Sequence, residues 1–318
     1  MSAPSLLVGI DTEADDQWTL EGRRKLEVRN AERLPALQAL FDDLGVRPAY
    51  LVTHEMASRP ESAAILRDLA RSGRCEIGTH LHPWSSPPFR PEDLDGHTYP
   101  HQLPTELLER QITDLTQLIE AQIGVRPTTY RAGRNGFDGR SLRVLESLGY
   151  TVDTSVDPLF NETRKGGRVF AGAPVGPYFP DFDDVCRAGS ARVLEVPISS
   201  ATDPALPKSL EAVYTRMPPL PYRGWLKRLG LRAVWLRPSY TPLERMKALA
   251  ARLTSRGVSC LNVIFHSSEV LPGGSPYNRD EASVTRFLDE LRRFLEYATG
   301  KLSAQGRTFA EFRAGWPA

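Results

Sequence analysis

The chain has 318 residues and an almost balanced charge, with 40 Lys and Arg against 39 Asp and Glu and a formal net charge of +1. Its composition, 41% hydrophobic and 25% charged, is that of a globular protein and excludes a largely disordered one. The near-zero net charge excludes a general electrostatic affinity for nucleic acid, and no apolar run is long enough to span a bilayer.

The N-terminal residues and the cysteines indicate the compartment. The start of the chain, MSAPSLLVG, has neither the basic segment nor the long apolar segment of a secretory signal. Cys75, Cys186 and Cys260 are too few and too scattered for a disulfide framework or a zinc–thiolate site. We therefore expect a protein of the cytoplasm, and no feature of the sequence defines its oligomeric state.

Short apolar runs alternate along the chain with longer segments of helical periodicity. Strands are expected at residues 6–11, 48–53, 75–80, 128–131, 150–153, 193–197 and 259–265, with a last short one at 308–312. Helices are expected at residues 33–44, 61–72, 105–123, 141–148, 243–256 and 279–299. This alternation predicts an α/β protein with a parallel sheet, in a single domain that spans residues 1–318.

Three segments interrupt the alternation. Residues 81–104 form a Pro-rich loop that is too long for a simple connection, and residues 166–188 could form a β-hairpin. Residues 206–239 are a Pro-bounded insertion with a basic, Trp-containing, helix-like centre. This insertion could rest on an anionic membrane, but a lid over the barrel mouth is the favoured interpretation.

Side chains with catalytic or metal-binding chemistry follow the expected strands at their carboxyl ends. Asp11 and Glu13 follow the first strand, and His80 and His82 follow the third. The other strand-end candidates are Arg131, Asp153 and His266. In parallel α/β barrels these ends meet on one face, where catalytic groups lie, so the pattern predicts an active site.

The spacing of the acids and histidines narrows the chemistry. Asp11 and Glu13 are two residues apart, so in extended backbone their carboxylates point the same way. They could act as acid and base on a glycoside, or one could bind a metal while the other acts as a base. His80 and His82 in GTHLHPW also share a face and can hold a divalent cation, which favours the metal. Arg131 can orient a carboxylate through a forked contact.

The remaining candidates complete a set for metal-assisted hydrolysis. His266 is a candidate acid, and Asp153 is either a carboxylate that orients it or a turn residue. A second pair, His97 and His101 in HTYPH, has a spacing that brings side chains together only on a helix, which the flanking Gly and Pro disfavour. We therefore expect that pair at most to contact substrate, and the first pair to hold the metal.

Five motifs, in order along residues 6–266, resemble those of the polysaccharide deacetylase family, the NodB-like carbohydrate esterases. GIDTE resembles the family's Asp-Asp motif, EIGTHLHP its metal-binding histidine motif, YRAGRNG its Arg-x-Pro-Tyr motif, VDTSVD its Asp-x-x-Trp motif and NVIFH its Leu-x-Leu-x-His motif. The second acid here is Glu, one residue instead of three separates the histidines, and Gly-Arg replaces Pro-Tyr. HLHPW, RAGRNG and HSSEVLPGGSPY resemble a subgroup associated with cell-surface polysaccharide biosynthesis.

The resemblance implies a distorted (β/α)7 barrel with loop insertions near residues 81–104, 166–188 and 206–239. It also implies a metal-dependent hydrolase that removes an acetyl group, N-acetyl in preference to O-acetyl, from a sugar or polysaccharide precursor. Asp11 would be the base, oriented by Arg131, and His266 the general acid, tuned by Asp153. The three residues Glu13, His80 and His82 would hold a divalent metal, with zinc preferred over cobalt or nickel.

The same resemblance suggests substrate contacts and partners. Ile264 would border the acetyl pocket, and Trp84 and Arg134 are candidate substrate contacts. The aromatic rings of the long loop, Trp84, Phe89 and Tyr99, could stack on sugar rings or pack in the core. The expected partner is an acetylated sugar or a lipid-linked saccharide. Contact of residues 223–237 with a membrane is the alternative to the favoured lid. The alternatives are a metal-free glycosidase, a C–N hydrolase of a small cyclic amide, and a sugar-binding barrel without activity.

Overall fold

A parallel sheet of seven strands forms the centre of the molecule, in the order β9-β1-β2-β3-β4-β5-β6. The structure is a computed structural model that describes residues 3–89, 94, 96, 98–217 and 222–317. The strands are β1 (Ser5–Thr12), β2 (Ala49–Val52), β3 (Glu76–Leu81), β4 (Thr129–Ala132), β5 (Val152–Asp153), β6 (Leu194–Glu195) and β9 (Cys260–His266). A short strand, β10 (Gln305–Gly306), pairs with the first residues of β1.

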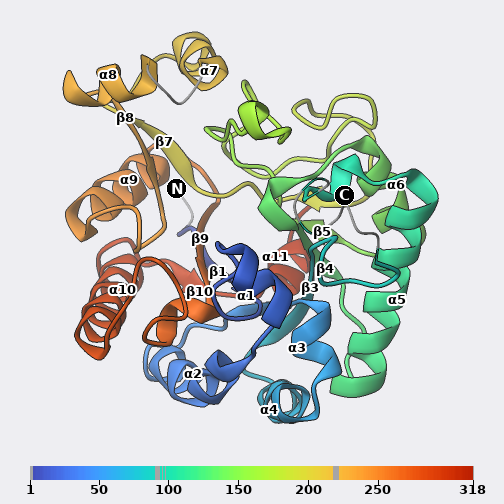
Figure 1. The fold of residues 1–318 in the computed structure, drawn as a ribbon. Coiled ribbons are helices and arrows are strands. Elements are labelled where there is room, and N and C mark those ends of the chain that lie inside the picture. Colours follow the sequence, from blue (N-terminus) through green and yellow to red (C-terminus); the bar gives the residue numbers. More distant parts are fainter. Residues whose placement is uncertain (1–2, 90–93, 95, 97, 218–221, 318) are drawn as a thin grey trace.

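Helices surround this sheet on its outer face (Figure 1). They are α2 (Leu34–Asp43), α4 (Pro60–Arg71), α5 (Thr105–Ile123), α6 (Gly139–Ser147), α9 (Leu243–Ser255) and α10 (Glu281–Lys301). The ring is incomplete, because the connection from β5 to β6 contains only the one-turn 3-10 helix η5 (Thr163–Lys165). Within the described residues no ladder joins β6 to β9, so the fold is the expected distorted (β/α)7 barrel, incompletely closed.

The alternation of side chains along β1 separates the two layers of the core. Leu6, Val8 and Ile10 belong to a large hydrophobic cluster that they share with residues of the surrounding helices. Leu7 points the other way, into a smaller cluster with residues of β2, β5 and β6 inside the barrel. Because successive strand residues alternate between faces, Asp11 shares the inward face with Leu7 and lies at the carboxyl end of the strand.

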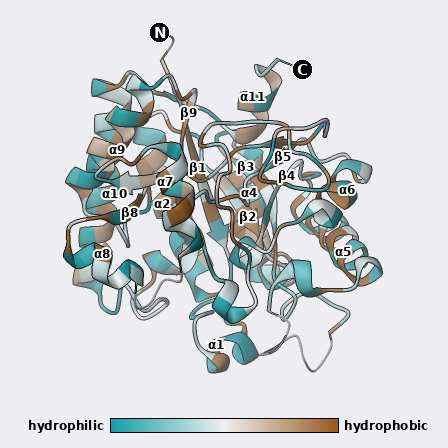
Figure 2. Ribbon diagram, turned by 90° about the horizontal axis from the view of Figure 1, so that it is seen from above, coloured by the Kyte–Doolittle hydropathy of each residue, from teal (hydrophilic) through white to brown (hydrophobic). Residues whose placement is uncertain are grey.

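The last helix, α11 (Phe309–Ala314), closes the end of the barrel that lies opposite the carboxyl ends of the strands. Phe309 and Phe312 are buried in the same interior cluster as Leu7, and Figure 2 shows α11 and α1 (Leu20–Lys25) at opposite ends of the molecule. The prediction of a strand at residues 308–312 is therefore wrong. The two phenylalanines are three residues apart, a helical spacing, and Thr308 and Glu311 form a capping box that starts the helix.

Of the segments that interrupt the α/β alternation, one lacks the expected hairpin and another contains a hairpin. Residues 166–188 form isolated bridges, among them Pro180 with Ala188, and no regular hairpin. The segment from 200 to 239 contains a β-hairpin of β7 (Ser200–Asp203) and β8 (Arg232–Trp235), with α7 (Lys208–Arg216) and α8 (Gly224–Arg228) between its strands. Across the described residues, no helix has both the length and the apolar content that a membrane span requires.

Candidate active site

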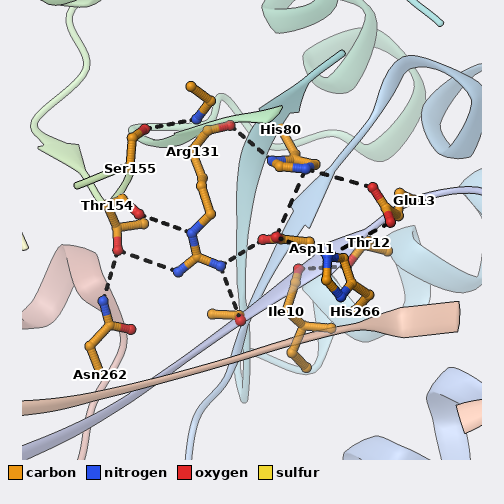
Figure 3. Close-up of polar contacts among 12 residues, drawn as sticks. Ile10, Asp11, Thr12, Glu13, His80, Arg131, Thr154, Ser155, Asn262 and His266 are labelled. Atoms are coloured by element: carbon orange, nitrogen blue, oxygen red, sulfur yellow. Dashed lines mark hydrogen bonds and ion pairs between the residues drawn. The ribbon is translucent and has the colours of Figure 1, made fainter. Parts of the chain in front are cut away.

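The strand-end residues converge at the mouth of the barrel (Figure 3). In the sheet register Asp11 lies beside His266, and His80 lies beside Arg131. A cavity of about 320 Å³ opens at this place. Among the residues expected for the site, those that line it are Asp11, Glu13, His80, His82, Trp84, Arg131, Arg134, Ile264 and His266.

A buried ion pair between Asp11 and Arg131 forms the base of the cavity. Arg131 Nη1 donates to Asp11 Oδ1 at 2.6 Å, and the guanidinium also donates to the backbone oxygens of Gly9 at 3.2 Å and Thr154 at 3.0 Å. Burial alone would raise the pKa of Asp11, but the charge of Arg131, with help from two histidines, holds that pKa well below its usual range. Asp11 is thus an ionised carboxylate whose second oxygen, Oδ2, is left to face the histidines.

The absence of a side chain at Gly9 makes room for this guanidinium. A Cβ atom at Gly9 would lie 2.4 Å from Nη2 of Arg131, well inside contact distance. Since Gly9 is the inward-facing residue between Leu7 and Asp11, the strand can pass behind Arg131 only if this position has no side chain.

Replacing Gly9 by Ala is expected to destabilise the protein by about 1–3 kcal/mol, the usual cost of overpacking a core. The shifted guanidinium would also leave Asp11, so activity should fall together with stability. Gly300→Ala is the matched control, because nothing lies within 4 Å of a Cβ there, in helix α10. Denaturant unfolding of both variants measures the difference, and equal stabilities would contradict this role of Gly9.

Glu13, His80 and His82 form a buried cluster of metal-ligand type. One donor atom from each lies within 4.8 Å of the others, the only such group of three or more found in the described part of the chain. His82 Nε2 is 2.9 Å and His80 Nε2 is 3.7 Å from Glu13 Oε2. Donor atoms around a tetrahedral zinc ion, at roughly 2.0–2.2 Å from it, are about 3.3–3.6 Å apart, so small side-chain adjustments would seat an ion.

Hydrogen bonding and burial prepare both imidazoles for this role. His80 Nδ1 is 2.9 Å from the backbone oxygen of Arg131, which can only accept, so the proton lies on Nδ1 and the lone pair of Nε2 faces the acids. His82 Nε2 faces the carboxylate of Glu13, so it carries the ring proton. Because Nδ1 of His82 has no hydrogen-bond partner among the described residues, that proton could move to Nδ1 and leave the lone pair of Nε2 for an ion. Burial lowers the pKa of His80 to about 4 and that of His82 to about 3, which keeps both rings neutral.

His266 stands on the other side of Asp11 and is held by residues that the sequence did not single out. Its Nδ1 is 2.7 Å from Oε1 of Glu269, and its Nε2 is 3.8 Å from Oδ2 of Asp11. Arg237 lies beside the pair, with Nη2 3.3 Å from the same oxygen of Glu269. The side chain of Glu269 is fully buried, and the spacing of His and Glu in HSSE is the signal that could have revealed it.

The surroundings raise the pKa of His266. Burial and the charge of Arg237 would lower this pKa, but the carboxylates of Glu13 and Glu269 outweigh both and raise it above its usual value. The raised pKa favours the protonated ring, which is the form that can donate a proton. Trp18 packs edge-on against it, with ring centroids 5.0 Å apart.

Asp153 does not contact His266 as expected; Glu269 makes that contact instead. The carboxylate of Asp153 accepts from the backbone N–H of Ser155 at 2.9 Å and from the Ser155 hydroxyl at 2.8 Å. Ser155 Oγ in turn accepts from the N–H of Ala132, next to Arg131. Burial raises the pKa of Asp153 to about 6, and the strand pairing places the equally buried Glu195 beside it. Through Ser155, Asp153 is linked to Ala132 of β4 and so to the strand that carries Arg131.

The residues expected to contact substrate differ in how far other side chains already engage them. Trp84 stacks on His82 at 4.0 Å between centroids and is covered by Arg23 on its ring at 4.6 Å, so it supports the metal cluster. Arg134 donates to the Tyr99 hydroxyl at 2.7 Å and stacks on that ring. Tyr99 is buried.

Neither Phe89 nor His101 is part of the metal cluster. Phe89 is 57% exposed. His101 Nε2 is 3.2 Å from the backbone oxygen of Gly166, and this residue is not part of the metal-ligand group. His97 lies outside the described residues.

Comparison with known proteins finds solved structures of similar fold. The sequence matches no protein-family model and no curated protein. A candidate polysaccharide deacetylase from Mycobacterium smegmatis is 13% identical, with a TM-score of 0.58 over 98% of this chain and 90% of that one. A candidate glycoside hydrolase or deacetylase from Parabacteroides distasonis is 14% identical, with a TM-score of 0.64 over 98% and 71%.

A 4-α-glucanotransferase from Thermococcus litoralis is also similar, at 12% identity and a TM-score of 0.57 over 99% of this chain and 41% of that chain. At such low identity these likenesses show a common architecture and leave the activity open. The chain has the (β/α)7 barrel fold of NodB-like deacetylases.

Proposed function

We propose that the protein is a metal-dependent hydrolase that removes an acetyl group, N-acetyl in the first place, from a sugar or polysaccharide precursor. The observation that carries the proposal is the arrangement of Glu13, His80 and His82 beside the ionised Asp11 and beside His266, whose pKa is raised. The deacetylase-type fold and the sequence motifs support it.

Each group in the cavity has a distinct task in this reaction. When bound, a divalent ion such as zinc lowers the pKa of water towards about 7 and polarises the acetyl carbonyl. Asp11 takes the proton of the attacking water through Oδ2, while Arg131 holds the carboxylate in place and ionised. His266, on the opposite side, gives its proton to the departing sugar amine, which cannot leave as an anion.

Chelation tests this proposal. Removal of metal with a strong chelator is expected to abolish release of acetate from an N-acetylglucosamine oligomer, and added zinc or cobalt is expected to restore it. Acetate release would be measured on protein whose metal content is checked before and after. Unchanged turnover by protein verified to be metal-free would contradict the proposal.

The contact of Glu269 with His266 predicts a change in pH dependence. As an acid, His266 works only while protonated, so kcat falls as pH rises through its pKa. Glu269→Gln removes a negative charge 2.7 Å from the ring and lowers that pKa, so the fall should begin at lower pH. We expect a lower kcat as well, by roughly 10-fold, from poorer orientation of the ring.

Glu244→Gln, at an exposed position on α9, is the control for this change and should leave the profile unchanged. pH–rate profiles of both variants give the answer. An alkaline limb that stays where it is in Glu269→Gln would assign the proton transfer to another group.

A further inference from the structure

Positive charge is concentrated in the insertion at residues 206–239. This segment has seven Lys and Arg against one acid, Glu211, although the whole chain is almost neutral. Glu211 is engaged internally, since it accepts from the N–H and the hydroxyl of Thr202 at 2.8 and 3.0 Å. Figure 1 shows α7 and α8 of this insertion outside the ring of helices, beside β7 and β8.

A second cavity, of about 500 Å³, lies within this basic insertion and the start of α9. Four cations line it: Arg223, Lys227, Arg232 and Arg245. None of the described residues that line it carries a carboxylate. The cavity is larger than the one at the metal cluster. That cavity is lined by acids and cations together, whereas the charged described residues that line this one are all cations.

Two of these cations lack partners. Arg245 pairs with Asp203, and Arg223 donates to the backbone oxygen of Leu159 at 3.2 Å. Within the described part of the chain, the exposed Lys227 forms no ion pair, and Nε of Arg232 is buried without an acceptor. A buried donor without an acceptor costs free energy, and an anionic oxygen placed here would relieve that cost.

This basic cavity adjoins the catalytic one. Trp235 and Tyr240 line both the basic cavity and a smaller cavity of about 250 Å³. That smaller cavity shares Ile264, Arg237 and again Tyr240 with the cavity at the metal cluster. A ligand could therefore extend from His266 past Tyr240 to the cations.

We propose that the basic cavity is a subsite for a phosphate or diphosphate ester carried by the acetylated substrate. The inference rests on the proposed function, in that the acetyl group of the same molecule would lie at the metal cluster. Arg and Lys side chains bind such groups through charge-assisted hydrogen bonds, which Lys227 and Arg232 can supply without breaking existing contacts. The ester can come from a soluble sugar diphosphate or from a lipid-linked sugar, since Tyr222, Trp225 and Leu229 nearby are 59%, 65% and 79% exposed.

Calorimetric titration of the full chain with inorganic diphosphate tests the subsite without any turnover. Lys227→Gln/Arg232→Gln is expected to weaken binding by at least about tenfold, since each lost contact to a charged group is worth a factor of ten or more. Arg228→Gln is the matched control on the same helix, because Arg228 does not line the cavity, and should change the dissociation constant by less than about twofold. Absence of binding, or equal affinity in the wild-type and double-variant proteins, would overturn the proposal; thermal melts confirm that the variants fold.

Two further arms identify the source of the phosphate. If the double variant binds a soluble diphosphate-linked N-acetyl sugar more weakly than the wild type does, the ester is the free one. If the double variant instead loses binding to phosphatidylglycerol vesicles, the ester is membrane-borne. If the wild-type protein binds diphosphate and the double variant does not, the subsite is supported even when the protein shows no deacetylase activity. Conversely, deacetylation without diphosphate binding would uphold the proposed function and overturn the subsite.

Discussion

Replacing Asp11 by Asn is expected to lower kcat by at least about 100-fold, the scale for losing a general base. The amide has nearly the shape of the carboxylate but cannot take a proton, so the water would have no acceptor at Oδ2. Because Glu13, His80 and His82 are untouched, the metal content should remain that of the wild-type protein.

The same substitution has a structural cost that must be separated from the catalytic one. Arg131 is 1% exposed and would lose its ionised partner, and breaking a buried pair in this way costs about 3–5 kcal/mol. Activity should therefore be measured at a temperature where thermal melts show the variant folded. A kcat within about threefold of wild type in folded protein would show that Asp11 is not the base.

The double substitution His80→Ala/His82→Ala is expected to remove the bound metal and reduce activity to background. Each imidazole supplies one of only three protein donors in the buried cluster, so too few remain to hold an ion. Both rings lie in the interior, where smaller side chains leave a cavity, so we also expect some loss of stability.

The matched comparison is His97→Ala/His101→Ala, which removes the other histidine pair. His101 contacts the oxygen of Gly166 and is not part of the cluster, so this protein should keep its metal. Metal stoichiometry by elemental analysis of both proteins decides between the pairs. Loss of metal only in His97→Ala/His101→Ala would overturn the assignment to His80 and His82.

The position of the site could be predicted from the sequence because it depends on strand order alone. Apolar runs such as LLVGID and LNVIF identify parallel strands, and the carboxyl ends of parallel strands must meet. Asp11, His80 and His266 therefore come together whatever the detailed packing.

The partners of these residues depend on packing that no local pattern encodes. Arg237 reaches His266 because the backbone of Leu236, just after β8, is hydrogen-bonded to Ser199 and to Ile264 of β9. Glu269 reaches the same ring through the 3-10 turn η7 (Ser267–Val270) after β9. The family resemblance assigned the tuning of His266 to Asp153, but the carboxylate of Asp153 is hydrogen-bonded to Ser155 and does not line the cavity. Short strands of two residues, such as β5 and β6, carry too little periodicity for their pairing to be predicted.

Anomalous diffraction from crystals grown with zinc or cobalt tests the central claim most directly. The account predicts one anomalous peak at about 2.0–2.2 Å from Nε2 of His80, Nε2 of His82 and a carboxylate oxygen of Glu13. Asp11 should lie beside this peak with its Oδ1 still bonded to Arg131. A metal-loaded protein with no peak at these three residues, or with its peak at His101, would contradict it.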